Sequence, residues 1–187
     1  MKYNTSEISN ILHNGDTFTK ISILSSLSET TDLAIIREII SALDDKEIRV
    51  RGEAFSSLFL NFNDVSEVLI SSLTSESKNI RGFCALILAN RGNTNSINSL
   101  INLTKDTSGM VRSCAFGALG HLKAKKAKNE IHTGIFDENN EVKKSAAFAL
   151  YLIEEKLSEL EKKELETQND NDFEKILKCW TGRDLNP

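Results

Sequence analysis

Five copies of one apolar skeleton constrain the fold of this 187-residue chain more than any other feature. In the clearest copy, VRSCAFGALGHL, the residues Val111, Ala115 and Leu119 recur every four positions, which places them on one face of a helix. The copies begin at residues 19, 50, 80, 111 and 142, so they are 31, 30, 31 and 31 residues apart. One such unit cannot bury its apolar face alone. The period therefore predicts an all-α chain of stacked repeats that share a continuous core.

Each repeat is expected to contain a leading helix and a second helix. The predicted pairs cover 17–27 and 32–43, 47–61 and 65–73, 78–90 and 94–104, and 109–122 and 124–136. A small residue at Ala54, Cys84, Ala115 and Ala146 would let adjacent leading helices approach closely. In the irregular first copy, Phe18 and Leu33 are among the residues expected to face inward.

The fold expected from this pattern is a right-handed α-solenoid of about five two-helix repeats, forming a single domain over residues 1–187. Residues 1–15 would form an N-terminal cap helix, 16–165 the repeats, and 166–187 a C-terminal cap and tail. The last leading helix starts near Glu141 and has no clear stop, so it is expected to continue through Leu157, Leu160 and Leu165. Phe173, Ile176, Leu177 and Trp180 would form the closing amphipathic turns.

Composition favours a folded, soluble protein. Hydrophobic residues make up 40% of the chain, and the only proline is Pro187, which long helices tolerate well. The apolar runs are too short to span a bilayer, and the start, MKYNTSEISN, has no apolar signal core, so a cytoplasmic location is expected. Three cysteines without a secretory signal favour free thiols, although a Cys84–Cys114 bridge between neighbouring repeats is an alternative.

The run from Val111 to Leu122 resembles the short HEAT-like repeat of the bilin-lyase (PBS lyase) type, and the resemblance covers roughly residues 16–165. It implies a solenoid fold. It also implies a protein-binding scaffold as the usual function, with a few specialised enzymes among the members, so an enzyme or enzyme accessory of the bilin-lyase type is the alternative.

Other HEAT-like activities fit the residues poorly. His13, His121 and His132 are not followed by Glu, whereas HEAT-like deoxyhypusine hydroxylases carry paired His-Glu motifs for a di-iron site. HEAT-like DNA glycosylases need a basic groove with aromatic residues. This chain has one tryptophan, Trp180, and a nearly neutral body. We therefore expect no metal, no cofactor, no nucleic acid, no membrane partner and no catalytic residues.

A ladder of charged residues follows the period. Basic residues occupy one position in every repeat, and acidic residues lie five positions before three of the repeat starts, at Asp45, Asp106 and Asp137. The basic series is Lys20, Arg51, Arg81, Arg112 and Lys143. The pattern predicts contacts that tie each repeat to the next, with bidentate geometry where Arg is present and with Arg112 coupled to Asp106. A phosphate-binding ladder is the alternative.

Two surfaces could bind a partner. Ser66, Ser71, Asn95, Asn98, Ser99 and Asn102 give the second helices a polar, neutral face, expected on the concave side. Lys125, Lys126 and Lys128 crowd the start of the fourth second helix, where positive charge opposes the helix dipole without visible compensation in the sequence. A soluble lysine face is the alternative.

At helical spacing, Lys125, Lys128, Asn129 and His132 share one flank of this helix. The segment 154–174 contains nine acids and three lysines, a net charge of −6, which leaves about +2 for the rest of a chain of net charge −4. We expect the basic flank, together with Lys126, to bind an acidic segment of a protein partner, and the acidic segment 154–174 to compete for it.

Overall fold

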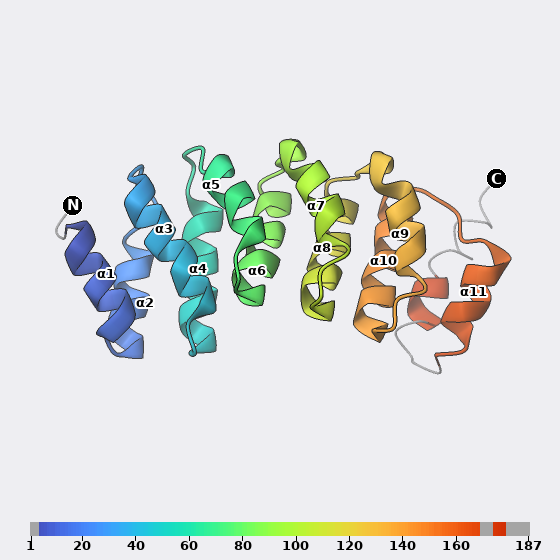
Figure 1. Ribbon diagram of the computed structural model, residues 1–187, viewed down its shortest axis with the longest axis horizontal. Helices are drawn as coiled ribbons and strands as arrows, with labels where there is room; N and C mark the ends of the chain where they lie inside the picture. Colours follow the sequence, from blue (N-terminus) through green and yellow to red (C-terminus); the bar gives the residue numbers. More distant parts are fainter. Residues whose placement is uncertain (1–3, 169–173, 179–187) are drawn as a thin grey trace. The chain divides into compact units, whose positions relative to one another are not determined.

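The computed structural model describes residues 4–168 and 174–178, and within those ranges every regular element is a helix (Figure 1). The chain groups into two compact units, Met1–Arg91 and Gly92–Pro187, called unit 1 and unit 2 below. The expectation of a single domain over residues 1–187 stays a prediction.

Unit 1 begins with a lone helix and continues with helix pairs. Its elements are α1 (Thr5–Asn14), α2 (Thr17–Ser25), α3 (Leu33–Ser41) with the 3-10 turn η1 (Ala42–Asp44), α4 (Ile48–Leu60), α5 (Ser66–Ser71) with η2 (Ser72–Thr74), and α6 (Lys78–Asn90). The leading helices α2, α4 and α6 pack in succession, α3 packs on α5, and α1 covers parts of α2 and α3.

Unit 2 continues the same alternation. Its elements are η3 (Thr94–Ser96) with α7 (Ile97–Leu103), α8 (Gly109–His121), η4 (Lys125–Ala127) with α9 (Lys128–Gly134), α10 (Asn140–Leu152) and α11 (Glu159–Glu166), followed by a short helix over 174–178. The leading helices α8 and α10 pack on each other, and α9 packs on α10. These bounds agree with the predicted pairs to within a few residues.

Polar side chains start many of these helices by satisfying the first main-chain N–H groups, which have no partner within the helix. Asn4 and Ser158 form complete capping boxes with Glu7 and Glu161. Asp16, Asp32, Ser77 and Asn139 cap the starts of α2, α3, α6 and α10. These side chains therefore define where the helices begin.

The predicted small residues lie in the core. Ala54, Cys84, Ala115 and Ala146 are all 0% exposed, as are the leucines four positions later. Gly120 shows how closely two leading helices approach, because a Cβ on this residue would lie 2.7 Å from Cα of Ala149 on α10. The repeat spacing thus predicted the register of the core.

The first copy was predicted incorrectly at two positions. Phe18 is 78% exposed and Leu33 is 50% exposed, so neither faces inward. Leu27 is buried as predicted, and Ile23 and Lys20 of the same copy are buried as well, in the register of the later repeats. The apolar character of Phe18 and Leu33 was misleading because both lie in the first turn of a helix, outside that register.

The last leading helix does not run on as predicted. It ends at Leu152, and Glu154 adopts the left-handed conformation with φ of 64°, which no helix can continue through. A separate helix, α11, then begins after the capping box of Ser158. This Ser-x-x-Glu pattern was readable in the sequence and marks a helix start.

The predicted closing turn is described only in part. Ile176 and Leu177 are half-buried in the helix over 174–178, whereas Phe173 and Trp180 lie outside the described residues, as does the third cysteine, Cys179. Within those residues, no helix combines the length and apolar character needed to cross a membrane.

Candidate protein-binding site

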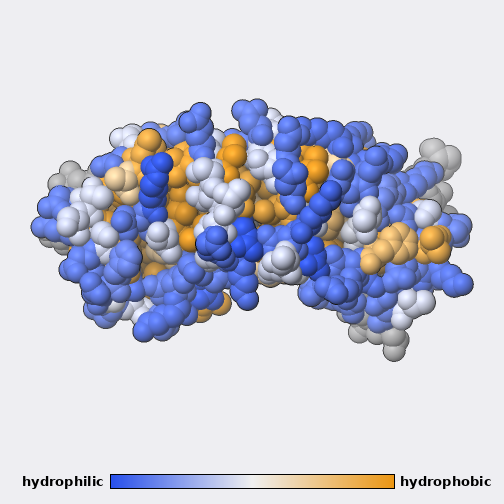
Figure 2. Space-filling view, viewed as in Figure 1, coloured by the Kyte–Doolittle hydropathy of each residue, from blue (hydrophilic) through white to orange (hydrophobic). Residues whose placement is uncertain are grey.

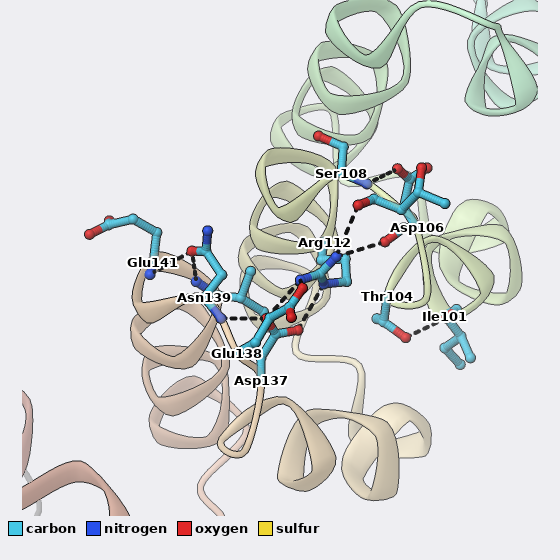
Figure 3. A network of polar contacts seen from close by, with 11 residues as sticks. Ile101, Thr104, Asp106, Ser108, Arg112, Asp137, Glu138, Asn139 and Glu141 are labelled. Carbon is cyan, nitrogen blue, oxygen red and sulfur yellow. Dashed lines mark hydrogen bonds and ion pairs between the residues drawn. The ribbon is translucent and has the colours of Figure 1, made fainter. Parts of the chain in front are cut away.

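The charged ladder connects successive repeats, as predicted, but the carboxylate partner of Arg112 differs from the one expected. Arg112 on α8 makes a bidentate pair with Asp137, which precedes α10, with Nε–Oδ2 and Nη2–Oδ1 distances of 2.8 Å (Figure 3). Both side chains are largely buried. Asp137, rather than the predicted Asp106, supplies the carboxylate of this pair. Asp106 instead accepts from the Ser108 main-chain N–H through its side chain and from Arg112 through its carbonyl.

The same step recurs at both ends of the described repeats. Lys20 Nζ lies 2.7 Å from Asp45 Oδ2, and Lys143 Nζ lies 2.5 Å from Glu164 Oε1 on α11. In addition, Arg51 donates to the carbonyl of Asp45, as Arg112 does to that of Asp106. The ladder therefore has a structural function, because its contacts fasten leading helices to neighbouring turns and, at Lys143, to α11.

Two acids of this ladder, Asp137 and Asp45, have lowered pKa values and are ionised at neutral pH. Burial pushes the pKa of Asp137 upward, but hydrogen bonds from Arg112 and Asn139 and the Arg112 charge outweigh it and hold the pKa below its ordinary 3.8. Asp45 follows the same pattern with Lys20 and Glu47 as donors. Because their charges are already matched within the protein, these positions favour the structural interpretation over phosphate binding.

Two of the predicted basic residues contact the acidic segment of the same chain. Lys128 Nζ lies 2.6 Å from Glu155 Oε2, and the more exposed Lys125 lies 3.6 Å from Glu154. The positive charge at this helix start is therefore compensated, contrary to the expectation from the sequence. The compensation was invisible there because it comes from residues that follow α10.

His132 forms the inner end of this contact. Its Nδ1 lies 2.6 Å from Glu161 Oε1, and Glu161 is only 4% exposed. Burial alone would raise the pKa of Glu161. Hydrogen bonds from Ser158 and His132 have the larger effect and hold the pKa below its ordinary value. Leu157 and Leu165 are buried on either side of Glu161 in the sequence. The acidic segment up to α11 is thus packed against the repeats as an integral cover.

The other two predicted residues face a different side. Lys126 Nζ lies 2.9 Å from Asn98 Oδ1 on α7, and both side chains are exposed. Asn129 is exposed at the edge of a groove of about 380 Å³, and its carboxamide forms no hydrogen bond within the described part of the chain. The five predicted residues therefore do not form one surface. Lys125, Lys128 and His132 face the acidic segment, and Lys126 and Asn129 face α7 and the groove.

This groove lies between the end of α7 and α9, where α9 approaches its neighbours closely. The full lining is Thr104, Lys105, Phe116, Asn129, Glu130, Thr133, Gly134, Phe136 and Asp137. Gly134 makes the close packing possible, since a Cβ there would lie 2.5 Å from the Phe116 ring and 2.8 Å from Ala146. Phe136 is 48% exposed, so the groove combines an accessible aromatic ring with polar edges.

Sequence reasoning missed Lys105 and Phe136 as members of a site. Lys105 is exposed, and its ammonium group has no partner within the described residues. The available signal was a phenylalanine directly after the buried pair Gly134 and Ile135, at a position where burial was not required. On the second helices, the predicted polar residues Asn95, Asn98 and Asn102 are exposed, and hydrophilic side chains dominate the visible surface, with apolar ones in the hollows between them (Figure 2).

The described cysteines are suited to packing. Cys84 and Cys114 are free thiols. Burial raises the pKa of Cys84 to about 12 and that of Cys114 to about 11, so neither forms a reactive thiolate at neutral pH. Within the described residues, no group of three or more His, Cys, Asp or Glu side chains is placed to hold a metal ion.

These features define a helical repeat protein, with stacked helix pairs, a shared core and a polar surface over the second helices. A family model for HEAT repeats matches residues 66–151, which supports the resemblance drawn from the run Val111 to Leu122. No curated protein matches the sequence closely enough to count as a relative.

Several solved structures share the fold. An engineered protein matches with a TM-score of 0.58 at 17% identity, over 95% of each chain. The complex of CpcE and CpcF of phycocyanin lyase from Nostoc sp. PCC7120 matches with a TM-score of 0.58 at 18% identity, over 96% of this chain and 76% of that one. A designed armadillo repeat protein in complex with the peptide (KR)4 matches with a TM-score of 0.50 at 16% identity, over 95% and 98%. The predicted all-α solenoid of two-helix repeats is thereby confirmed.

Proposed function

We propose that this protein is a non-catalytic adaptor that binds a segment of another protein over α7 and α9. The observation that carries the proposal is the groove beside α9, with the half-exposed ring of Phe136 and the unpaired carboxamide of Asn129 among the described residues. An apolar side chain of the partner would occupy the groove. The Asn129 amide would bind the partner's main chain, because a carboxamide can donate and accept at once.

The lysines give the expected partner its charge. Lys125 is largely exposed, Lys126 is bonded to the exposed Asn98, and Lys105 is unpaired among the described residues, so all three can bind acidic side chains at little cost. Lys128 and His132 are assigned to the same acidic segment of the partner, but they become available only when Glu155 and Glu161 release them. The expected partner is therefore an acidic segment with one apolar anchor.

The class of fold supports this proposal. One similar structure, a designed armadillo repeat protein, holds a peptide, and another is a complex between two proteins, CpcE and CpcF. Within unit 2, α7 and the turn η4 before α9 carry exposed polar side chains such as Asn98 and Lys126, which suit an extended peptide better than a small substrate.

The test is affinity purification from the native host with the wild-type protein and three variants, followed by quantitative mass spectrometry. Phe136→Ser with Asn129→Ala should lose the partner. Phe148→Ser is the matched control, because Phe148 lies in the same unit with a similar exposure of 51%. Lys125→Ser with Lys126→Ser should weaken capture most at low salt. Equal capture by all variants would reject the groove and the lysines together.

An accessory function of the bilin-lyase type is the second candidate, favoured by the similarity to the CpcE and CpcF complex. This candidate predicts that the absorbance spectrum of an added bilin changes when the protein is present, because a bound bilin is held in a defined conformation. An unchanged spectrum at saturating protein would remove this candidate and leave the adaptor proposal in place.

A further inference from the structure

A second surface, in unit 1, presents large apolar side chains where the chain leaves α4. Phe59, Leu60 and Phe62 are 43%, 65% and 76% exposed, and they are called the apolar turn below. Three such residues within four positions are unusual for a solvent-facing turn, and clustered exposed apolar groups mark interaction sites. The groove beside α9 is not involved, because it lies in unit 2.

The apolar turn is anchored on its inner side by two asparagines. Asn61 is 1% exposed and donates from Nδ2 to the Thr30 carbonyl at 2.9 Å, while its Oδ1 accepts from the Asn63 N–H at 2.8 Å. Asn63 donates to the carbonyls of Glu29 and Thr30 at 3.3 Å. The exposed side chains therefore project from main chain that is bonded to the preceding repeat.

Arg91 fastens the same turn from the other side. Its guanidinium donates to the carbonyls of Leu58, Phe59 and Asn61 through Nη1, and to that of Asn63 through Nη2 at 2.7 Å. The first two of these carbonyls belong to the last turn of α4, where they have no partner within the helix. One residue thus holds the helix end and the turn together, so the exposure of the apolar side chains is a fixed feature.

Other repeats show that the fold does not require apolar residues here. The chain leaves α6 through Asn90, Arg91 and Gly92, and it leaves α8 through His121, Leu122 and Lys123. These segments are mainly polar. Exposing apolar side chains to water costs free energy, and these two other helix ends do not carry that cost. The apolar turn therefore indicates a function other than stacking of the repeats.

Acidic side chains border the apolar turn. Glu29 and Asp64 are exposed, and Glu29 belongs to the segment that Asn63 binds. Hydrogen bonds from Ser66 lower the pKa of Asp64, slightly opposed by burial, and the Arg91 charge lowers it further. At neutral pH the apolar turn therefore has anionic neighbours, while the Arg91 charge is bound to main-chain carbonyls.

We propose that the apolar turn docks a basic amphipathic helix of a partner protein, with its apolar face on Phe59, Leu60 and Phe62 and its cationic residues beside Glu29 and Asp64. The argument for this occupant is charge complementarity, since an apolar face with basic flanks matches an apolar turn with acidic neighbours. This surface is independent of the groove beside α9, so a test of one does not decide the other.

The experiment measures binding of the full-length protein to three synthetic peptides of about 18 residues, which is about five helical turns. The first has leucines on one face and lysines on the other. The second has the same composition in scrambled order, and the third replaces every lysine by glutamate. Wild-type protein should bind only the first peptide, and Phe62→Ser with Leu60→Ser should weaken that binding about tenfold or more.

Two further variants separate docking from general stickiness. Ile48→Ser removes a side chain that is 72% exposed at the other end of α4, and it should leave the affinity unchanged. Glu29→Gln with Asp64→Asn should remove most of the salt dependence of binding. The second change keeps a side-chain oxygen at position 64, so the hydrogen bond from the Ser66 main-chain N–H can still form.

Each of three other results would overturn the proposal. The first is equal affinity for the scrambled or glutamate peptide, and the second is full affinity after Phe62→Ser with Leu60→Ser. The third is that no peptide binds while sedimentation shows the protein to self-associate, and that this double variant abolishes the self-association. The last result would assign the apolar turn to a second copy of the chain.

Discussion

Arg112 and Asp137 lie 25 residues apart in the sequence and face each other through two parallel hydrogen bonds of 2.8 Å. The pair joins one leading helix to the turn before the next. Because both side chains are 12–13% exposed, removal of either one leaves the other charge poorly solvated.

We therefore expect Arg112→Ala to lower the free energy of unfolding by about 1–3 kcal/mol. Chemical denaturation of Arg112→Ala, Asp137→Ala and the double variant should give a coupling energy of at least about 0.5 kcal/mol. The matched cycle uses Asp106→Ala, which keeps the carbonyl that Arg112 binds and should be more nearly additive. A larger coupling with Asp106 than with Asp137 would contradict the observed pairing.

Two glycines of α8 provide a test of the helix spacing. A Cβ on Gly120 would lie 2.7 Å from the main chain of Ala149, whereas a Cβ on Gly117 would meet nothing within 4 Å. Gly120→Ala should therefore lower the free energy of unfolding by about 1–3 kcal/mol through overpacking. Gly117→Ala should raise it by up to about 1 kcal/mol, because alanine favours a helix. Thermal or denaturant melts of the two variants measure both effects, and equal melts would mean that α8 and α10 are not in close contact.

Glu161 should make the stability dependent on pH in the acid range. Its folded pKa lies below the ordinary 4.5, because the bonds from Ser158 and His132 outweigh its burial. The carboxylate therefore contributes stability that is fully present above about pH 4.5 and is lost as the pH falls through the folded pKa. Denaturation between about pH 7 and pH 3 should show a shallower loss for Glu161→Gln. Glu159→Gln is the control on the same helix, with a side chain 90% exposed, and should follow the wild type.

Removal of the acidic segment should unfold part of the protein. A chain that ends after Lys156 lacks Leu157, Glu161 and Leu165, which are 5%, 4% and 0% exposed. It also leaves Lys143 without Glu164. We expect a clear fall in the melting temperature and increased hydrogen exchange in α10, whereas a chain that ends after Gln168 should keep the stability of α11. An unchanged melting temperature after the shorter cut would show that the segment is a removable competitor, as the sequence suggested.

Local spacing predicted much of the fold, because one period sets both the helix register and the small core residues. The register predicted Ala54, Cys84, Ala115 and Ala146 as buried, and all are. The errors arose where the period gives no information. It says nothing about the end of α10, which depends on the positive φ of Glu154.

The candidate site was less accessible from the sequence. The sequence pointed to three lysines, because positive charge at the start of a helix opposes the helix dipole. These are Lys125, Lys126 and Lys128. The partners of Lys125 and Lys128 could not be found, because they depend on the path of the chain after α10. The same applies to Arg91, whose side chain binds a turn about 30 residues earlier. Contacts at that distance follow from how repeats stack, which a pattern within one repeat does not encode.

The rungs of the ladder bear on how such a chain can change in length during evolution. Lys20 and Asp45 are separated by 25 residues, as are Arg112 and Asp137. Both of these ion pairs, called rungs here, take the basic residue from one repeat and the acidic residue from the start of the next. A tandem duplication or deletion of one whole repeat therefore gives an equivalent ion pair at the new junction and leaves no buried charge without a partner. An insertion between the two members of a rung does not, so growth by whole repeats is tolerated where growth by loops is not.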